Sequence, residues 1–489
     1  MSRQTQTQRR EFLKRLGATV AGGTAAAWMP QLNLMAQSMR ATCPNPPNYR
    51  AIVCVYLAGG NDAWNMVIPT DATRYQSYLN SRGGVYDAAT NPAGVGVGSA
   101  ALLPITPSNG GSYGLHPSCG DFTVGTPAIT VPGLRTLFNQ NRIAVLPNVG
   151  TLIRPITKTE YNSNPALRPP QLFSHNDQEK LWNLGKTQLN ERYGWGGLLA
   201  DRINQCNGRA DVPACISVAG TSLFQVGQEV FPYGLSTSAT GAVGLSAYTN
   251  ASPTSSDALR RNVLSNLLTA NNTNLLQREY GAVTKRSIDL FTDFSTALQA
   301  PANQVALARP ANNSLADQLW TVARTIRART MLQQNRQVFY VRLGGFDTHD
   351  AQMGANGQPL LITRINQALG WFYAALQEMG MESNVVTFTM SEFARTLNSN
   401  GNGTDHAWGS LQLVMGGNNV GGGKIYGSFP EASLNGPISF SRGQFIPDLS
   451  VDQIGAQLGL WMGLENSDLA AIFPNYANFS ATALSGLAV

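Results

Sequence analysis

Past residue 48, short apolar runs alternate with segments whose apolar residues recur every three or four positions. The runs are rich in β-branched residues and have the length of buried strands, and AIVCVYL at 51–57 is the clearest. The pattern predicts strands at 51–57, 142–147, 214–218, 337–343, 384–390 and 411–415. It predicts helices at 132–140, 177–185, 195–204, 257–298, 314–333 and 360–379, and a last helix that begins near Asp452.

This alternation predicts an α/β fold with a mainly parallel central sheet sandwiched by helices. Between residues 221 and 312 the pattern weakens into sequence rich in Ser, Thr, Ala and Asn around one predicted helix. We interpret 221–312 as an insertion that forms a cap region. We expect residues 37–489 to form one α/β domain that contains it, because large α/β enzymes often reach this length as one unit with insertions.

The first 36 residues follow a different pattern. The sequence QRREFLK at 8–14 contains the pair Arg9 and Arg10, and a Gly- and Ala-rich apolar run follows at 16–28. This arrangement is typical of a twin-arginine signal peptide, although an ordinary amphipathic helix is the alternative. We therefore expect residues 1–36 to bind the twin-arginine translocase. The mature protein is then expected in the periplasm or outside the cell.

Charge and hydropathy narrow the classes of partner. The net charge of +6 comes largely from the basic residues of 1–36, and the remaining chain is close to neutral. Such a chain offers no electrostatic reason to bind nucleic acid. No later stretch approaches about 18 uninterrupted apolar residues, so we expect no stable membrane span after cleavage.

The five cysteines fit an oxidising compartment. Cys206 and Cys215 flank a short polar stretch and are candidates for a small disulfide loop, and Cys43 and Cys119 are a second candidate pair. Cys54 lies inside an apolar run, so we expect it to be a buried free thiol. There is no C-x-x-C zinc pattern.

Acidic and imidazole side chains stand next to several predicted strands. In parallel sheets, ligands bind outside the carboxyl ends of the strands, so these side chains are expected to meet at one edge. Carboxylates and imidazoles together suit zinc, manganese or iron. The sequence thus predicts a site for a divalent metal, with zinc among the candidates, and a purely structural role is the alternative. The candidate ligands are Asp62, Asp347, His349, Glu392 and His406.

The two other histidines lie in loops beside hydroxyl residues. His116 and His175 are candidates for a general acid or base near neutral pH, although a hydrogen-bonded structural histidine is the more common case. Ser174 precedes a predicted helix with several early acidic residues. It is a candidate nucleophile or oxyanion-binding residue, and a plain helix N-cap is the alternative.

The motifs together closely resemble a bacterial exported family called domain of unknown function 1501. They are the twin-arginine start, LAGGNDAWNMVIP, SHND, GGFDTHD and SEFART followed by NGNGTDHAWG, and the likeness extends from about residue 50 onward. That family is similar to the alkaline phosphatase and sulfatase superfamily. The resemblance implies an alkaline-phosphatase-like fold with one or two metals at strand ends, where a Ser, Thr or modified Cys attacks phosphorus or sulfur.

By position, Asp62 resembles the first metal-binding aspartate of the superfamily, and Asp347 with His349 resembles the later Asp/His pair. His406 resembles the final metal-binding histidine, and Ser174 is the best placed candidate nucleophile. Glu392 departs from the pattern, because the phosphatases have an Asp-His pair there. This departure removes one imidazole from a second metal site.

Two functions follow as hypotheses. The first is a metal-dependent hydrolase of phosphate or sulfate esters, with Ser174 or a metal-activated water as nucleophile and His116 or His175 as acid or base. The second is a non-catalytic exported protein that binds a glycan, the cell wall or a protein partner. Several tryptophans near the motifs, including Trp64 and Trp408, are candidates for stacking on sugars, although packing is the commoner role.

Overall fold

The computed structural model describes residue 43 and residues 48–244, 256–270 and 272–488. The chain divides into two units, residues 1–42 and 43–489. The predicted signal peptide at 1–36 lies outside the described residues, so its export role stays a prediction. Within the described part of the chain, no helix combines the length and apolar character needed to cross a membrane.

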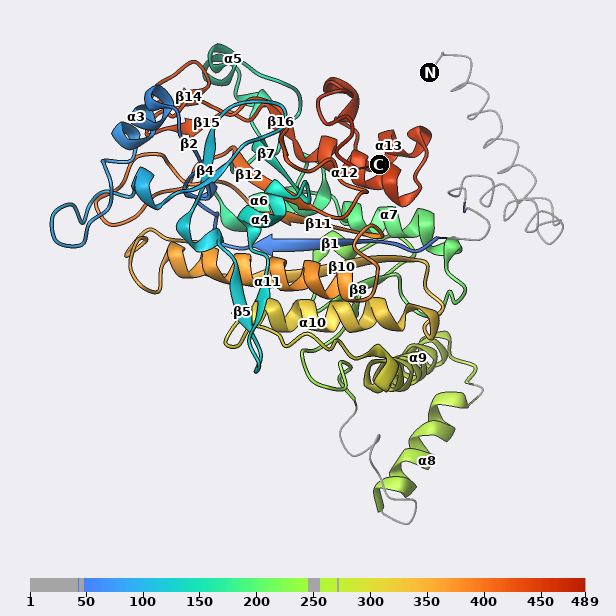
Figure 1. The fold of residues 1–489 in the computed structure, drawn as a ribbon. Coiled ribbons are helices and arrows are strands. Elements are labelled where there is room, and N and C mark those ends of the chain that lie inside the picture. Colours follow the sequence, from blue (N-terminus) through green and yellow to red (C-terminus); the bar gives the residue numbers. More distant parts are fainter. Residues whose placement is uncertain (1–42, 44–47, 245–255, 271, 489) are drawn as a thin grey trace, which may run out of the picture. The chain divides into compact units, whose positions relative to one another are not determined.

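A nine-stranded sheet forms the centre of the second unit, in the order β13-β7-β12-β11-β1-β10-β8-β9, and β16 pairs with β7 (Figure 1). Only β12 runs antiparallel to its neighbours β11 and β7, and every other pairing in this sheet is parallel. The predicted mainly parallel α/β sheet is therefore confirmed. The strands are β1 (Arg50–Leu57), β7 (Ile143–Gly150), β8 (Cys215–Ser217), β9 (Tyr233–Gly234), β10 (Arg336–Leu343), β11 (Val385–Met390), β12 (Ser410–Met415), β13 (Lys424–Ile425) and β16 (Leu449–Ser450).

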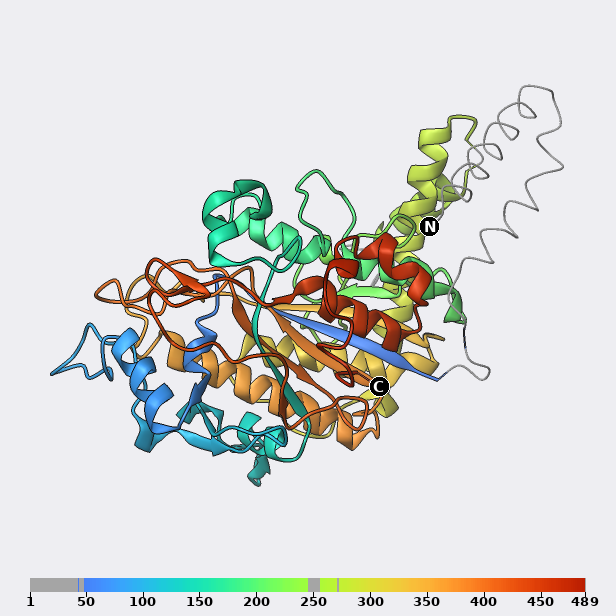
Figure 2. The same cartoon turned by 90° about the horizontal axis from the view of Figure 1, so that it is seen from above.

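Helices cover both faces of this sheet, as the side view and the view from above show (Figures 1 and 2). One face carries α10 (Ser314–Arg327) and α11 (Gln358–Glu378). The opposite face carries α6 (His175–Leu184), α7 (Trp195–Ile203) and α12 (Val451–Met462). The remaining helices are α3 (Ala72–Ser81), α4 (Leu134–Asn139), α5 (Lys158–Ser163), α8 (Ser256–Thr269), α9 (Leu275–Gln299) and α13 (Asn466–Ile472).

Three small sheets lie beside the central one. The first contains three strands and the other two contain two strands each. Their strands are β2 (Val67–Pro69), β3 (Leu103–Ile105), β4 (Tyr113–Leu115), β5 (Phe122–Val124), β6 (Ile129–Val131), β14 (Ser439–Phe440) and β15 (Gln444–Phe445).

The core follows the two-residue period of the strands. Ala51, Val53, Val55 and Leu57 of β1 are almost completely buried and belong to the large apolar cluster that also contains residues of α10 and α11. The alternate residues of β1 point to the opposite face, and they are buried too. Burial on both faces explains why the strand reads as a continuous apolar run.

Residues 221–312, the predicted cap region, differ from the expected pattern of elements in two ways. The predicted helix at 257–298 is two helices, α8 and α9, because Asn274 caps the start of α9 by accepting a hydrogen bond from the backbone N–H of Gln277 at 3.2 Å. In addition, β9 lies within the region and extends the central sheet next to β8.

The disulfide pairing differs from both predicted pairs. Cys43 is bonded to Cys206, whereas Cys119 and Cys215 are buried free thiols. Cys215 opens β8 and is fully buried within the sheet, so its closeness to Cys206 in sequence does not bring the two sulfurs together. The prediction that Cys54 is a buried free thiol is confirmed.

Candidate metal centre

Three central strands end at the same level, which places the residues that follow them at one edge of the sheet. The register pairs Leu57 of β1 with Leu343 of β10, and Tyr56 with Met390 of β11. Antiparallel β12 starts at this edge, so the residues before it arrive there as well. The sequence-based expectation of convergence rests on this geometry.

Gly59 allows two of these strand ends to approach closely. Its φ of +119° is in the region that favours glycine, and a Cβ atom built there would lie 2.3 Å from the backbone N of Asp347. A larger residue would therefore push the loop after β1 away from the loop after β10.

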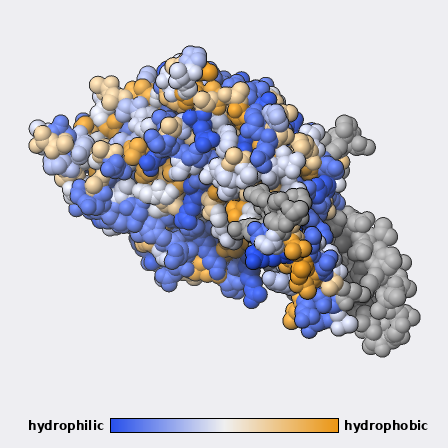
Figure 3. Space-filling view, turned by 90° about the horizontal axis from the view of Figure 1, so that it is seen from below, coloured by the Kyte–Doolittle hydropathy of each residue, from blue (hydrophilic) through white to orange (hydrophobic). Residues whose placement is uncertain are grey.

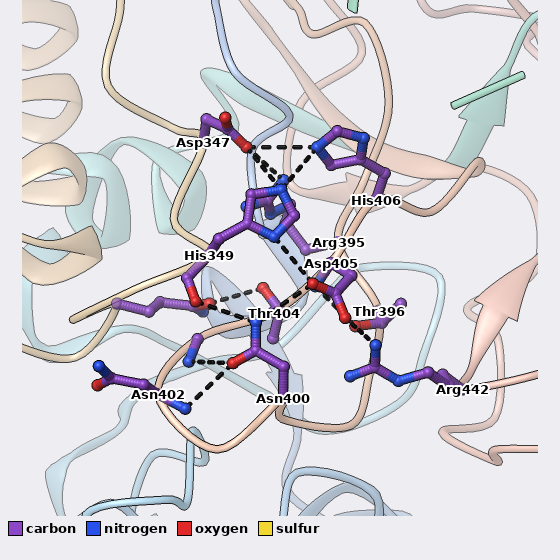
Figure 4. A network of polar contacts seen from close by, with 12 residues as sticks. Asp347, His349, Arg395, Thr396, Asn400, Asn402, Thr404, Asp405, His406 and Arg442 are labelled. Atoms are coloured by element: carbon purple, nitrogen blue, oxygen red, sulfur yellow. Dashed lines mark hydrogen bonds and ion pairs between the residues drawn. The ribbon is translucent and has the colours of Figure 1, made fainter. Parts of the chain in front are cut away.

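Three imidazoles converge on one carboxylate oxygen, Oδ1 of Asp347 (Figure 4 shows two of them). Its distances to the Nε2 atoms are 3.2 Å for His349, 3.3 Å for His406 and 3.6 Å for His175. The Nε2 atoms of His349 and His406 are themselves 2.9 Å apart. The structure thus brings together Asp347, His349 and His406 as predicted, and it adds His175.

Each of the three imidazoles is also held through its other ring nitrogen, Nδ1. The partners are Oε1 of Glu392 for His175 at 2.8 Å, Oδ1 of Asp405 for His349 at 2.8 Å, and the carbonyl oxygen of Phe173 for His406 at 2.9 Å. Metal-binding histidines commonly donate their second N–H to a carboxylate or a carbonyl group, which fixes the orientation of the ring.

These partners determine where the ring protons lie. A carbonyl oxygen can only accept, so Nδ1 of His406 carries the proton, and the Asp405 carboxylate imposes the same state on His349. In the neutral rings, both Nε2 atoms then present lone pairs to each other at 2.9 Å. Such a contact is repulsive unless a cation lies beside both atoms. Burial lowers the pKa of both histidines, which favours a metal ion over a proton.

The spacing of the ligand atoms fits a small divalent ion. Zinc bonds to nitrogen at about 2.0–2.1 Å, so tetrahedral ligand atoms lie about 3.3 Å apart. One ligand atom each from His175, Asp347 and His406 lies within 4.8 Å of the others. Asp347 is 49% exposed, so the centre opens to solvent on one side. The donor set therefore fits zinc or a similar borderline ion.

Glu392 lies behind His175 rather than among the ligands. It is buried, and its Oε1 accepts from the backbone N–H of Gly59 at 2.7 Å as well as contacting His175. Its Oε2 accepts from the Tyr56 hydroxyl at 3.1 Å. The hydrogen bond to Glu392 raises the pKa of His175. Glu392 therefore orients the His175 ring, whereas the sequence pattern predicted it to bind the metal.

Asp62 is separated from the imidazole cluster by its own buried cation. Its Oδ2 forms an ion pair with Arg82, and both side chains are completely buried. The same oxygen accepts a hydrogen bond from Nε2 of Gln352 at 2.6 Å. Asp62 was predicted to bind a metal ion. The Arg82 guanidinium already neutralises its carboxylate at Oδ2 and would compete with a metal ion for that oxygen.

A second buried arginine supports Asp347 from the protein side. Arg395 is fully buried and donates from Nη1 to Oδ1 of Asp347 at 2.9 Å (Figure 4). Partial burial raises the pKa of Asp347, but the Arg395 guanidinium outweighs this effect and the pKa is lowered overall. The carboxylate is therefore ionised at neutral pH and available to a metal ion.

The remaining predicted residues have local roles. Ser174 is the N-cap of α6, and its hydroxyl donates to Oδ2 of Asp177 at 2.7 Å. His116 accepts at Nδ1 from the backbone N–H of Ser118 at 3.1 Å and thereby caps a short 3-10 helix (Pro117–Cys119). Burial lowers the pKa of His116 to about 4, so this ring is neutral at physiological pH.

Sequence reasoning missed the residues that support the ligands. Arg82, Arg395 and Tyr56 carry no metal-binding signature, and each acts through a contact between segments far apart in the chain. Arg395 offered a weak signal, because it stands in the motif SEFAR directly after β11. The structure also places Trp64 and Trp408 in the core, each less than 5% exposed. They pack rather than stack on a ligand.

Comparison with known proteins places this centre in context. The family described as "Protein of unknown function (DUF1501)" matches residues 49–440. None of the curated proteins compared with the chain matches it. Among solved structures, the chain is similar to the PsFucS1 sulfatase from Pseudoalteromonas sp., with 10% identity, a TM-score of 0.36, and 90% of this chain and 72% of that chain covered.

Two alkaline phosphatases show weaker likeness. For the enzyme from the Antarctic bacterium TAB5, the identity is 12% and the TM-score is 0.26, with 75% of this chain and 90% of that chain covered. For wild-type alkaline phosphatase PafA, the identity is 11% and the TM-score is 0.27, with 72% of this chain and 64% of that chain covered. TM-scores this low carry no inference about activity.

Proposed function

Since the chain belongs to the DUF1501 family, we propose that it is a hydrolase of phosphate or sulfate esters that uses a single divalent metal ion. One observation carries the proposal. The Nε2 atoms of His349 and His406 face each other at 2.9 Å, while both Nδ1 atoms are committed to acceptors. A cation between these rings and the Asp347 carboxylate satisfies all three groups. The ester class comes from the resemblance of the sequence motifs.

The residues of the proposed metal centre have different roles. His175, His349, His406 and Asp347 would hold the ion, and Arg395 keeps the Asp347 carboxylate charged. When bound, a divalent ion supplies Lewis-acid polarisation of a non-bridging ester oxygen and lowers the pKa of a water molecule. Because Asp347 is half exposed, an ester can reach the outer side of the centre.

The described residues near the centre offer no clear side-chain nucleophile. The Ser174 hydroxyl is committed to Asp177 in an N-cap, so its geometry supports a structural role. We therefore assign the attack to water rather than to Ser174. A Ser174→Ala variant that retains at least half of the turnover would support this assignment, and a complete loss would return Ser174 to the role of nucleophile.

Elemental analysis of the protein from its native host tests the metal directly. We expect about one equivalent of a divalent ion and hydrolysis of aryl phosphates or aryl sulfates. In a His349→Ala, His406→Ala double variant, turnover should fall at least about 100-fold, since polarisation by a metal contributes several kcal/mol. A metal-free native protein that is inert towards both ester classes would contradict the proposal.

The alternative of a non-catalytic binding protein rests on the Ser174 N-cap alone. It predicts that neither ester class is turned over, whether or not a metal ion is bound. Normal function in vivo after replacement of Asp347 and His406 by alanine would favour it.

We also propose that the protein is exported by the twin-arginine route. The Cys43–Cys206 disulfide supports this proposal, because such bonds persist in oxidising compartments. Replacement of Arg9 and Arg10 by lysine should retain the chain in the cytoplasm, as cell fractionation would show. Export that continues unchanged would contradict this route.

A further inference from the structure

Helices α8 and α9 carry an unusual concentration of exposed apolar side chains. Of the fifteen large apolar residues exposed in the described part of the chain, seven lie on these two helices. We call this group the hairpin patch, and its members are Leu259, Val263, Leu267, Leu275, Leu276, Tyr280 and Val283, each between 58% and 79% exposed. Figure 3 views the side on which the two helices lie, and apolar side chains gather at the surface at its lower right.

Six of the seven residues of the patch form a regular stripe, three on each helix. Leu259, Val263 and Leu267 follow one another at intervals of four residues, and Leu276, Tyr280 and Val283 at intervals of four and three. Such intervals place side chains on one face of a helix. In α8, this face is left exposed by the residues that the structure describes, because Ala258 is the one residue of that helix that is buried. An apolar stripe of this kind is normally covered by another part of the protein or by a partner.

The two helices contact each other through residues outside the stripes. A Cβ atom at Gly281 of α9 would lie 2.9 Å from the carbonyl oxygen of Leu268, so the helices pack through a glycine. The stripes are thus left free while the hairpin itself is closed. A hairpin with apolar stripes on both helices is complementary to another hairpin of the same kind.

The charges beside the patch favour a protein partner over a lipid surface. Arg260 pairs with Asp257 at 3.0 Å, and Lys285 pairs with Asp289 at 2.6 Å. An anionic membrane is attracted by basic side chains that are free of nearby acids. Here the two helices carry five basic and four acidic residues, so the hairpin has little net positive charge to attract such a membrane, which suits an interface with another protein.

The area of the patch matches what a dimer needs. Burying one aliphatic side chain removes roughly 100 Å² of apolar surface, so seven side chains about two-thirds exposed offer roughly 450 Å². Apolar atoms make up about 60% of an interface, so the patch corresponds to about 750 Å² per partner. Stable pairs bury about 800 Å² per partner.

We propose that the hairpin patch is the interface of a homodimer, in which a second copy of this chain packs its own α8 and α9 against the first across a two-fold axis. A two-fold axis makes one patch serve both copies, so a self-complementary stripe suffices. A neighbouring cavity of about 320 Å³, lined by Phe231, Tyr233 and Val283 among others, lies at the edge of the patch and would receive side chains of the second copy.

Analytical ultracentrifugation of the purified exported chain tests this proposal at micromolar concentrations. We expect the wild type to be a dimer, and the dissociation constant should rise at least about tenfold in Val263→Lys, because a charge would be buried in the stripe. Ser265→Lys is the matched control, since Ser265 is exposed on the opposite side of α8. It should leave the dimer intact.

Two further readouts keep the test decisive. The far-ultraviolet circular dichroism and melting temperature of Val263→Lys show whether the fold is retained, and Val263→Cys should form a covalent dimer under oxidation if the stripes face each other. A wild type that is monomeric, or a dimer that tolerates Val263→Lys, would overturn the proposal. Binding of the monomer to vesicles of phosphatidylethanolamine and phosphatidylglycerol would overturn it in favour of a lipid surface.

Discussion

Replacement of Glu392 by glutamine should weaken metal binding without lowering the stability of the fold, so it tests the two contributions of this residue separately. Glu392 Oε1 accepts from Gly59 and contacts His175 at 2.8 Å, and Oε2 accepts from Tyr56. Glutamine has the same shape, so its carbonyl oxygen can accept the first two hydrogen bonds. Its amide can donate to the Tyr56 oxygen once that hydroxyl turns. The variant therefore keeps every buried partner and loses the negative charge.

The loss of that charge should weaken metal binding. A carboxylate that accepts the second N–H of a ligating histidine makes the ring a better donor, and its replacement typically costs 10- to 100-fold in affinity. This range corresponds to about 1.4–2.7 kcal/mol. By contrast, Glu392→Ala leaves the Gly59 N–H and the Tyr56 hydroxyl without an acceptor in the core, so it should destabilise the fold by about 1–3 kcal/mol for each group.

The assay is competition for Zn²⁺ with a chromophoric chelator, together with guanidinium unfolding of the metal-free protein. Measurement at pH 8 is preferable. The hydrogen bond to Glu392 raises the pKa of His175, so a proton competes with the metal at lower pH. Asp289→Asn, which removes an exposed acid of α9, is the charge-matched control. Equal zinc affinity for wild type and Glu392→Gln would refute the assignment of His175 as a ligand.

Three further changes test separate parts of the structure. Gly59→Ala should destabilise the fold by about 2–5 kcal/mol in chemical unfolding, through its backbone conformation and its contact with Asp347. Gly220→Ala shares only the positive φ, has no neighbour within 4 Å, and should cost about 1–2 kcal/mol. Burial raises the pKa of Asp452 from 3.8 to about 7, so the folded chain retains a proton that the unfolded chain has lost within this window. Stability should therefore fall as the pH rises from about 4 to 7, and Asp452→Asn should flatten this fall by up to about 4 kcal/mol. A pH profile identical to that of the wild type would contradict this expectation. Cys43→Ser should lower the free energy of unfolding by about 3–5 kcal/mol, because the disulfide spans a sequence separation of 163 residues. The melting temperature of that variant should no longer respond to dithiothreitol.

The central strands of the fold could be predicted from the sequence because they are buried on both faces. β1, β10 and β11 read as continuous apolar runs, and their predicted and observed bounds differ by at most one residue. The break between α8 and α9 was missed, because apolar periodicity continues across it while the Asn274 cap acts locally. β9 was missed since two residues carry too little pattern to be recognised.

The candidate site was accessible only in part. The strand-end rule located Asp347, His349 and His406 because topology alone brings those positions together. The roles of Glu392 and Asp62 depend on partners that are remote in sequence, and no pattern in the sequence indicates which carboxylate faces an imidazole and which faces an arginine. The predicted disulfide pairs were wrong for a similar reason, since the spacing of cysteines in the sequence does not show which way their side chains point.

The two buried arginines favour one metal ion over two. Arg82 and Asp62 are both fully buried, so an ion that took the place of Arg82 at Oδ2 of Asp62 would leave the arginine without its carboxylate. Breaking a buried ion pair in this way costs about 3–5 kcal/mol. Asp347 differs, because Arg395 approaches it from the core while 49% of its side chain remains exposed. The Asp347 carboxylate is the one that three imidazoles surround, so an ion would find there a partly exposed carboxylate and nitrogen ligands that Asp62 does not offer.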